Sequence, residues 1–222
     1  MHKVTALIVA AGNGTRMNSS VKKQFLLIKD IPVFIHTVMA FQKSELIDDI
    51  VIVTAEEDID KTNTLVNSYG LNKVSKVVAG GNTRTQSVKN GLIYVNSPFV
   101  AIHDGARPCI KAKHIEQVVV TAVKYGGATL GVPVTDTLKA VTDDEIKNTV
   151  DRNGLWCIQT PQCFDTEVLK DAYIKSEGLT YTDDCQIFES RGLRVKVVAG
   201  DKSNIKITTG EDLELAKFLL KN

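Results

Sequence analysis

Basic and small residues gather in one segment near the start of the chain. The sequence AAGNGTRM occupies residues 10–17, and KKQF follows at residues 22–25. Small residues let the backbone approach a ligand closely, and exposed N–H groups can hold phosphate oxygens. Arg16 and Lys23 add two cations to this segment. The combination suits a triphosphate, whose charge must be held while more develops in the transition state.

Two better-known phosphate motifs do not fit this segment. Gly12 and Gly14 give only G-x-G, without the third glycine of the dinucleotide fingerprint and without the G-K-[ST] end of a Walker A motif. A dinucleotide-dependent oxidoreductase is therefore disfavoured. Glycines on their own could simply form a turn, and it is Arg16 and Lys23 beside them that favour a phosphate site.

A second polar segment, AIHDGARP, lies at residues 101–108. Asp104 could orient sugar hydroxyls or bind Mg²⁺ directly or through water, although an Asp before Gly also commonly caps a turn. His103 is more simply explained as a structural residue. Ligands bind beyond the carboxyl ends of parallel strands, so we expect Asp104, Arg107 and Arg16 at one edge of a sheet, as in an active site.

The elements that must position these residues alternate between short apolar runs and longer amphipathic stretches. We expect strands at residues 6–10, 50–54, 75–78, 99–103, 128–133 and 194–198. We expect helices at residues 33–42, 58–69, 85–95, 113–125, 167–175 and 211–220. This alternation indicates an α/β fold: a three-layer αβα sandwich with a mostly parallel, Rossmann-like sheet. We expect residues 1–222 to form a single domain.

Residues 135–158 break the alternation. Two polar, alternating stretches flank a turn near Asp143 and Asp144, which predicts a protruding two-stranded β-arm. An isolated hairpin is marginally stable in water, so we expect the arm to pack against a second subunit.

Composition excludes several classes of protein. The net charge of +1 argues against a nucleic-acid-binding protein, which usually carries a strong basic excess. None of the four cysteines is spaced as C-x-x-C, so reduced structural thiols are expected rather than zinc or a redox pair. The apolar run at the N-terminus is too short to span a membrane and lacks a cleavage region, so we expect a cytoplasmic protein.

Taken together, these segments resemble the 2-C-methyl-D-erythritol 4-phosphate cytidylyltransferases of the non-mevalonate isoprenoid pathway, and the resemblance runs nearly end to end. VDRNGLW at residues 150–156 is its most specific motif, because many sugar-nucleotide transferases share the first loop. The other motifs are the segments at residues 10–17, 23–24, 80–87, 103–108, 136–139, 160–162, 182–183 and 204–208.

The resemblance implies transfer of a cytidylyl group from CTP to methylerythritol phosphate, with release of pyrophosphate. Catalytic positions, which hold the triphosphate or the acceptor phosphate, match Arg16, Lys23, Arg152 and Lys206. CTP-binding positions match Ala10, Ala11, Gly12, Gly14, Gly81, Asn82, Ser87, Asp104 and Gly105. Acceptor-binding positions match Asp104, Arg107, Thr137, Thr160 and Thr182. The implied cofactor is Mg²⁺, held mainly by the CTP phosphates with Asp104 as a candidate ligand.

Family members are homodimers joined by the arm, so the resemblance implies that Thr137 and Arg152 complete the partner's site. The chain departs from the family at Asn82, where Asp is common near the cytosine, and at Gly105, where Ala is frequent. The first departure lies at a position that concerns base recognition. The second is expected to be tolerated.

The implied mechanism needs cations rather than a general base, because the attacking phosphate oxygen is already anionic at neutral pH. Two other functions remain open. A cytidylyltransferase for another polyol phosphate, such as ribitol 5-phosphate, would share the first loop but lack VDRNGLW. A non-catalytic nucleotide-sensing module would not need Arg152 or Lys206.

Overall fold

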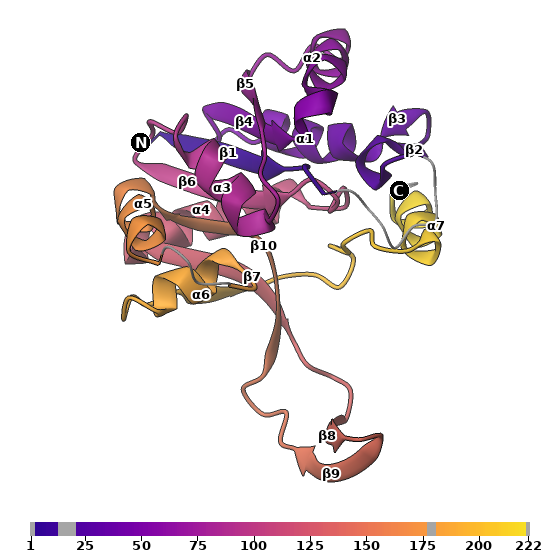
Figure 1. Cartoon of the computed structure of the whole chain (residues 1–222), viewed down its shortest axis with the longest axis vertical. Helices are drawn as coiled ribbons and strands as arrows, with labels where there is room; N and C mark the ends of the chain where they lie inside the picture. Colours follow the sequence, from indigo (N-terminus) through magenta and orange to yellow (C-terminus); the bar gives the residue numbers. More distant parts are fainter. Residues whose placement is uncertain (1–2, 13–20, 177–180, 221–222) are drawn as a thin grey trace.

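A seven-stranded sheet forms the centre of the molecule (Figure 1). The computed structural model describes residues 3–12, 21–176 and 181–220. In spatial order the strands are β11 (Lys196–Ala199), β7 (Gly127–Pro133), β10 (Trp156–Asp165), β6 (Phe99–Asp104), β1 (Val4–Val9), β4 (Asp49–Thr54) and β5 (Val74–Ala79). Neighbouring strands are parallel except that β10 runs antiparallel to both β7 and β6. The mostly parallel sheet predicted from the sequence is thus confirmed.

Helices cover both faces of this sheet. One face carries α1 (Val33–Lys43), α2 (Ile59–Ser68) and α4 (Ala112–Tyr125), and the other carries α3 (Arg84–Leu92), α5 (Thr166–Lys175) and α6 (Asp184–Glu189). Successive side chains of β1 serve the two faces in turn: Ala6 and Ile8 pack in the first core, and Leu7 packs in the second. This arrangement confirms the predicted three-layer sandwich.

The short strands β2 (Leu27–Ile28) and β3 (Ile31–Pro32) lie beside the C-terminal helix α7 (Gly210–Leu219). Two 3₁₀ turns, η2 (Lys23–Phe25) and η3 (Glu56–Asp58), precede β2 and α2 respectively. A third apolar cluster, which includes Ile28, Ile207 and Ala216, joins the β2–β3 hairpin to α7.

Besides the β2–β3 hairpin and the two 3₁₀ turns, two elements of the body were not predicted. Neither β10, as a strand of the central sheet, nor the short helix α6 was recognised in the sequence. Residues 156–158, which the predicted arm included, already pair with β7.

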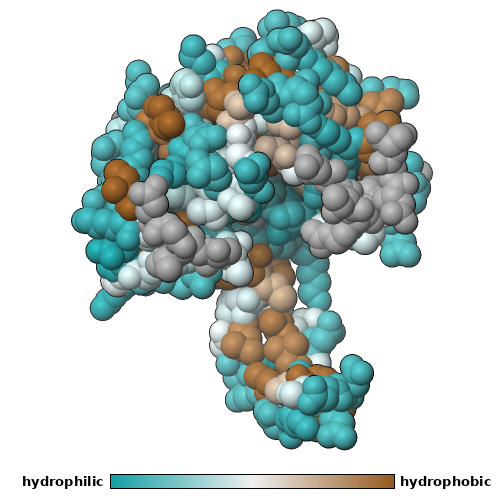
Figure 2. Space-filling model, viewed as in Figure 1, coloured by the Kyte–Doolittle hydropathy of each residue, from teal (hydrophilic) through white to brown (hydrophobic). Residues whose placement is uncertain are grey.

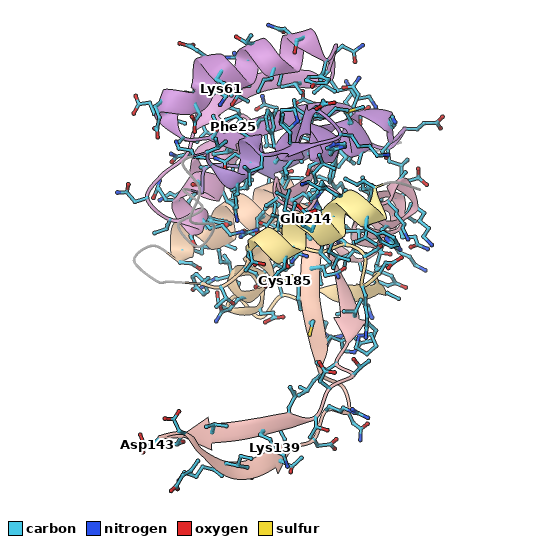
Figure 3. The ribbon with its side chains drawn as sticks, turned by 90° about the vertical axis from the view of Figure 1, so that its right-hand side faces the viewer. Phe25, Lys61, Lys139, Asp143, Cys185 and Glu214 are labelled. Carbon is cyan, nitrogen blue, oxygen red and sulfur yellow. The ribbon has the colours of Figure 1, made fainter. Side chains whose placement is uncertain are left out.

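The arm projects away from the body (Figure 1). At its far end β8 (Leu138–Thr142) pairs antiparallel with β9 (Glu145–Val150). Asp143, labelled in Figure 3, and Asp144 form the tip. Their φ angles of 51° and 63° lie in the left-handed region that short hairpin turns use.

No helix within the described residues is long and apolar enough to cross a membrane.

Candidate active site

A cleft of about 490 Å³ opens where β1, β4, β5 and β6 end. Its size is that of an ordinary small-molecule site. The lining comes from six chain segments: residues 9–12 at the end of β1, 23–24 in η2, 55–57 after β4, 80–84 with Ser87 at the start of α3, Asp104 with Ala106 at the end of β6, and Lys206. The carboxyl ends of parallel strands thus converge on one cleft, as expected for an α/β sheet.

Glycine allows one wall of the cleft to close tightly. A Cβ atom on Gly80 would lie 2.5 Å from the Cβ of Ala11 and 2.8 Å from the Oγ of Ser87. The amide of Gly80 donates to the carbonyl of Thr54 at 2.7 Å, which ties this wall to the end of β4. Only a residue without a side chain can bring the start of α3 so close to β1.

The start of α3 is held by local capping. Thr83 is the N-cap, and its side chain accepts a hydrogen bond from the amide of Gln86 at 3.0 Å. The hydroxyl of Ser87 donates to the carbonyl of Thr83 at 2.9 Å and accepts from the amide of Gly81 at 3.0 Å. Ser87, an expected CTP contact, therefore also fixes the glycine turn that lines the cleft.

Asp104 is the hub of the charged groups at the end of β6. Its Oδ1 lies 3.2 Å from Nε of Arg84, and its Oδ2 lies 2.7 Å from Nζ of Lys206 and 3.8 Å from Nε of Arg107. Burial alone would raise the pKa of this carboxyl, but Arg84, Lys206 and Arg107 outweigh burial and hold its pKa well below the ordinary value. Asp104 therefore stays ionised and acts as an anchor for cations rather than as a proton acceptor.

Arg84 links Asp104 to helices α5 and α6 on one face of the sheet. Its Nη2 lies 2.8 Å from Oδ2 of Asp184, which is fully buried, and the hydroxyl of Tyr173 donates to Oδ1 of the same carboxylate at 2.5 Å. Burial opposes the charge of Arg84, but Asp184 and Asp104 outweigh it and raise the pKa. Neither Arg84 nor Asp184 was assigned a role from the sequence. An arginine shortly after the paired glycines was the available signal.

Two of the residues expected to bind the acceptor substrate make hydrogen bonds with backbone groups at or near Asp104. The hydroxyl oxygen of Thr160 accepts a hydrogen bond from the amide of Asp104 at 3.1 Å, and Nη1 of Arg107 donates to the carbonyl of Asn204 at 2.7 Å. Thr182 lies just before α6, where its hydroxyl donates to Oε1 of Gln186 at 3.1 Å. Asp104, Arg107, Thr160 and Lys206 are thus brought together, whereas the contacts of Thr182 are with α6.

His103 is buried and held on both ring nitrogens. Nδ1 lies 3.0 Å from the hydroxyl oxygen of Thr160, and Nε2 lies 3.3 Å from the carbonyl of Arg107. Burial lowers the pKa of His103 to about 3, against the opposing charge of Asp104. The ring is neutral at physiological pH, in agreement with the structural role expected of it.

The other expected site residues fall into four groups. Ala10, Ala11, Gly12, Gly81, Asn82 and Lys23 line the cleft, whereas Gly105 packs behind it, where an added Cβ would lie 3.0 Å from the Cβ of Ala10. Thr137 and Arg152 are exposed on the arm, so the chain does not bring them to its own cleft. Gly14 and Arg16 lie outside the described residues.

The described part of the cleft does not contain a ready-made cage for a divalent cation. Within the described residues no group of three or more His, Cys, Asp or Glu side chains could hold a metal ion. Asp104 is the carboxylate at the hub, and both of its oxygens already contact cationic side chains. A divalent cation bound here would therefore be held largely by oxygens of the ligand, with Asp104 as the candidate protein carboxylate.

Comparison with known proteins gives one consistent result. A family profile described as 2-C-methyl-D-erythritol 4-phosphate cytidylyltransferase matches residues 4–222. Proteins of that name from Clostridium acetobutylicum and Caldanaerobacter subterraneus are 46% and 44% identical to the chain. The alignments cover 97% and 98% of this chain and 96% and 99% of theirs.

Solved structures agree with this match. The 4-diphosphocytidyl-2C-methyl-D-erythritol synthase of Anaerococcus prevotii superposes with a TM-score of 0.87 at 31% identity, over 100% of this chain and 97% of that one. The 2-C-methyl-D-erythritol 4-phosphate cytidylyltransferase of Thermus thermophilus superposes with a TM-score of 0.82 at 28% identity, over 97% and 98% of the two chains.

Proposed function

The chain belongs to the 2-C-methyl-D-erythritol 4-phosphate cytidylyltransferase family, and we propose that its reaction takes place in the cleft at the ends of β1, β4, β5 and β6. The chain is a CTP-dependent nucleotidyltransferase that forms 4-diphosphocytidyl-2-C-methyl-D-erythritol in isoprenoid biosynthesis. The family predicted from the sequence motifs is thereby confirmed.

The observation that carries the assignment is the charge pattern around Asp104. One ionised carboxylate holds Lys206, Arg84 and Arg107 at the edge of a cleft that is also lined by glycine-rich backbone. A nucleotide base and ribose suit the small-residue wall formed by Ala10, Ala11, Gly12, Gly81, Asn82 and Ser87. Gly105 supports this wall from behind Ala10. The phosphates would then face Lys23 and Lys206.

In the reaction an oxygen of the acceptor phosphate attacks the α-phosphorus of CTP. The new P–O bond forms as the bond between the α-phosphorus and the bridging oxygen breaks, and pyrophosphate leaves. Two polyanions must meet, and two unit charges 4 Å apart interact by roughly 4 kcal/mol at an effective dielectric of 20. Lys23 and Lys206 offset that repulsion, and Arg16 is assigned the same role by its family motif.

The acceptor would lie on the side of the cleft where Asp104, Arg107, Thr160 and Thr182 are found. Asp104, which is ionised, would accept hydrogen bonds from acceptor hydroxyls and hold Lys206 in place. Nucleotidyltransferases generally use divalent cations, and we assign Mg²⁺ to the CTP phosphates, with Asp104 as the candidate protein ligand. The ion would supply further positive charge at the phosphates.

We also propose that the enzyme acts as a homodimer. Thr137 and Arg152 are expected site residues, but both lie on the exposed arm, away from the cleft of their own chain. An arm that reaches a second subunit would bring Arg152 to the acceptor phosphate of that subunit. In this arrangement residues 1–222 form a single domain, and residues 135–158 serve as its dimerisation arm.

Pyrophosphate release from CTP and Mg²⁺, with methylerythritol phosphate and ribitol 5-phosphate offered separately, tests the function. We expect release with methylerythritol phosphate only. Release mainly with ribitol 5-phosphate would keep the mechanism but overturn the acceptor. Silence with both, from folded protein that binds CTP, would favour a nucleotide-sensing module.

A further inference from the structure

Lys22 and Lys23 are neighbours in the sequence but face different partners. Lys23 lines the cleft, and its Nζ donates to the carbonyl of Ile207 at 3.2 Å. Lys22 is not among the described residues that line the cleft. Its Nζ lies 2.5 Å from Oε1 of Glu57 and 2.6 Å from Oδ2 of Asp58. Glu57 and Asp58 belong to η3, the turn that follows β4.

A second contact holds the other end of the same short segment. The Nζ of Lys61, on α2, lies 3.9 Å from the centre of the Phe25 ring, a cation–π contact whose two residues are labelled in Figure 3. Phe25 is buried and packs edge-on against Phe34 of α1, with the ring centres 5.6 Å apart. The segment of residues 22–25 is therefore attached to the η3–α2 segment at both of its ends.

The ion pairs of Lys22 also reduce the negative charge at this side of the cleft. Glu57 lines the cleft that Lys23 lines, so its carboxylate would repel a triphosphate if it were not neutralised. Partial burial works against the charge of Lys22, but its hydrogen bonds to Asp58 and Glu57 outweigh burial and raise its pKa. Lys22 is therefore charged throughout the physiological range and offsets part of the negative charge of the two carboxylates.

We propose that Lys22, Glu57 and Asp58 form an ionic clasp that fixes η2 on the η3–α2 segment and so positions Lys23 against the CTP phosphates. Lys22 is then a positioning residue for the reaction, acting through Lys23 rather than by touching substrate. This inference rests on the role assigned to Lys23 above. A displacement of about 1 Å can cost up to 10²-fold in rate, so a clasp of this kind has a measurable effect.

The rival explanation is that Lys22 is a further phosphate-binding cation, which pairs with the two carboxylates only when CTP is not bound. The two explanations differ most sharply at Asp58. If Lys22 bound phosphate, Asp58→Asn would release it for that role and leave CTP binding equal or tighter. If the clasp positions Lys23, Asp58→Asn would harm the reaction in the same way as Lys22→Met.

The experiment is a double-mutant cycle on the full-length enzyme with Lys22→Met, Asp58→Asn and the double variant, assayed for kcat and KM with CTP and methylerythritol phosphate. We expect each single variant to lower kcat and kcat/KM together by about tenfold, because a transition-state contact is lost. The double variant should be no worse than the poorer single variant, since both changes open the same clasp. Lys22→Arg, which can still pair with both carboxylates, should recover most of the activity.

Controls separate this effect from loss of folding. Asp58 makes no side-chain capping bond to α2, so Asp58→Asn removes the ion pair without removing a helix cap. Glu57→Gln, at an exposed position, provides a milder opening of the clasp if Asp58→Asn melts early. Lys217→Met breaks a matched surface pair, Lys217–Glu214 at 2.7 Å on α7, and should leave kcat unchanged.

Two results would overturn the clasp: losses in the two single variants that multiply in the double variant, or a raised KM for CTP in Lys22→Met with none in Asp58→Asn. Lys23→Met distinguishes this failure from failure of the assigned site. Near-normal turnover in Lys23→Met would remove the premise itself. A collapse of turnover in Lys23→Met, with wild-type values in Lys22→Met and Asp58→Asn, would overturn the clasp alone.

Discussion

At the scale of single residues, two glycines that line the cleft differ in how closely the protein packs around them. An added Cβ on Gly12 would meet nothing within 4 Å, whereas one on Gly80 would meet Ala11 at 2.5 Å and Ser87 at 2.8 Å. The packing of the described residues therefore does not require glycine at position 12, and the space beside Gly12 is open to a ligand. Gly80 is required by the protein itself, because the start of α3 rests on β1 at this point.

Gly12→Ala should therefore change binding without changing stability. We expect the free energy of unfolding to stay within about 0.5 kcal/mol of wild type. We expect KM for CTP to rise by about tenfold, the equivalent of one charge-assisted hydrogen bond displaced from the backbone. Gly80→Ala is the matched comparison and should cost about 1–3 kcal/mol of stability through overpacking. Urea unfolding and steady-state kinetics on both variants test the contrast, and equal loss of stability in the two would contradict it.

Arg84 gives a prediction about stability. Arg84→Met leaves the carboxylates of Asp104 and Asp184 without their shared guanidinium, and Asp184 is fully buried. We expect a loss of roughly 3 kcal/mol in the free energy of unfolding, measured by urea denaturation. The double variant Arg84→Met with Asp184→Asn should recover part of this loss, because it removes an unpaired buried charge. A single variant as stable as wild type would show that the ion pair contributes nothing.

The place of a residue can be predicted from the sequence where that residue belongs to a local motif. Asp104 ends a strand and Arg107 follows it in the same turn, so the topology of the sheet alone indicated that both would lie at the ligand-binding edge. Arg84 and Asp184 could not be paired in this way. They stand 100 positions apart, and only the packing of α3 against the α5–α6 layer brings them together.

At the scale of elements, β10 shows why one strand escaped prediction. Its sequence interrupts the expected apolar run with Gln159, Thr160 and Gln162, which are nevertheless buried in the centre of the molecule. The side chain of Gln159 donates to the carbonyl of Asp201 at 3.0 Å, and the hydroxyl oxygen of Thr160 accepts a hydrogen bond from the amide of Asp104. Buried polar groups of this kind are stable only with partners, and partners from distant segments cannot be read from local periodicity.

Gln162 is another buried polar residue of β10, and it gives a prediction because its side chain holds the start of α6. Its Oε1 accepts from the amides of Asp184 and Cys185 at 3.1 and 3.2 Å, and its Nε2 donates to Oδ2 of Asp183 at 2.9 Å. Gln162→Leu is apolar and similar in size, yet it leaves the first amides of a buried helix end without partners. We expect a loss of about 2–4 kcal/mol in stability, summed over these groups.

Hydrogen exchange provides the direct measurement for this variant. Protection of the amides of Asp184 and Cys185 should fall, while amides in β1 and β4 should lose protection only in proportion to the global loss of stability. Uniform loss across the protein would argue that Gln162 stabilises the whole fold rather than the start of α6.

At the scale of the whole molecule, His103 makes stability depend on pH. Its pKa is about 3 in the folded protein because the ring is buried, and about 6.5 when unfolded. Between these values the unfolded chain binds a proton that the folded protein does not. Stability should therefore fall as pH falls below about 6.5, by up to about 1.4 kcal/mol per pH unit. Urea unfolding between pH 7 and about 4 measures this slope. It should be shallower in His103→Gln, and parallel curves for the two proteins would contradict the assignment.

The arm gives the prediction that concerns the assembly. Val141 and Ile146 lie opposite one another across β8 and β9, and they are 56% and 65% exposed. Figure 2 shows apolar surface along the arm, outside the body of the molecule. Exposed apolar side chains on a projecting hairpin indicate an interface. The double variant Val141→Asp with Ile146→Asp should therefore sediment as a monomer, keep the CTP affinity of wild type and lose most of its turnover.

A mixing experiment tests whether the dimer shares its sites. Lys23→Met disables the cleft of its own chain, and Arg152→Ala disables the arm that would reach the partner's cleft. Each variant alone should be inactive as a homodimer. Refolded together in equal amounts, half of the dimers are mixed, and each mixed dimer has one cleft with an intact Lys23 and an intact Arg152 from its partner. Activity should then return to about a quarter of wild type, as random symmetric pairing requires. If Arg152 instead served the cleft of its own chain, mixing would restore nothing, because neither chain would hold a complete set of residues.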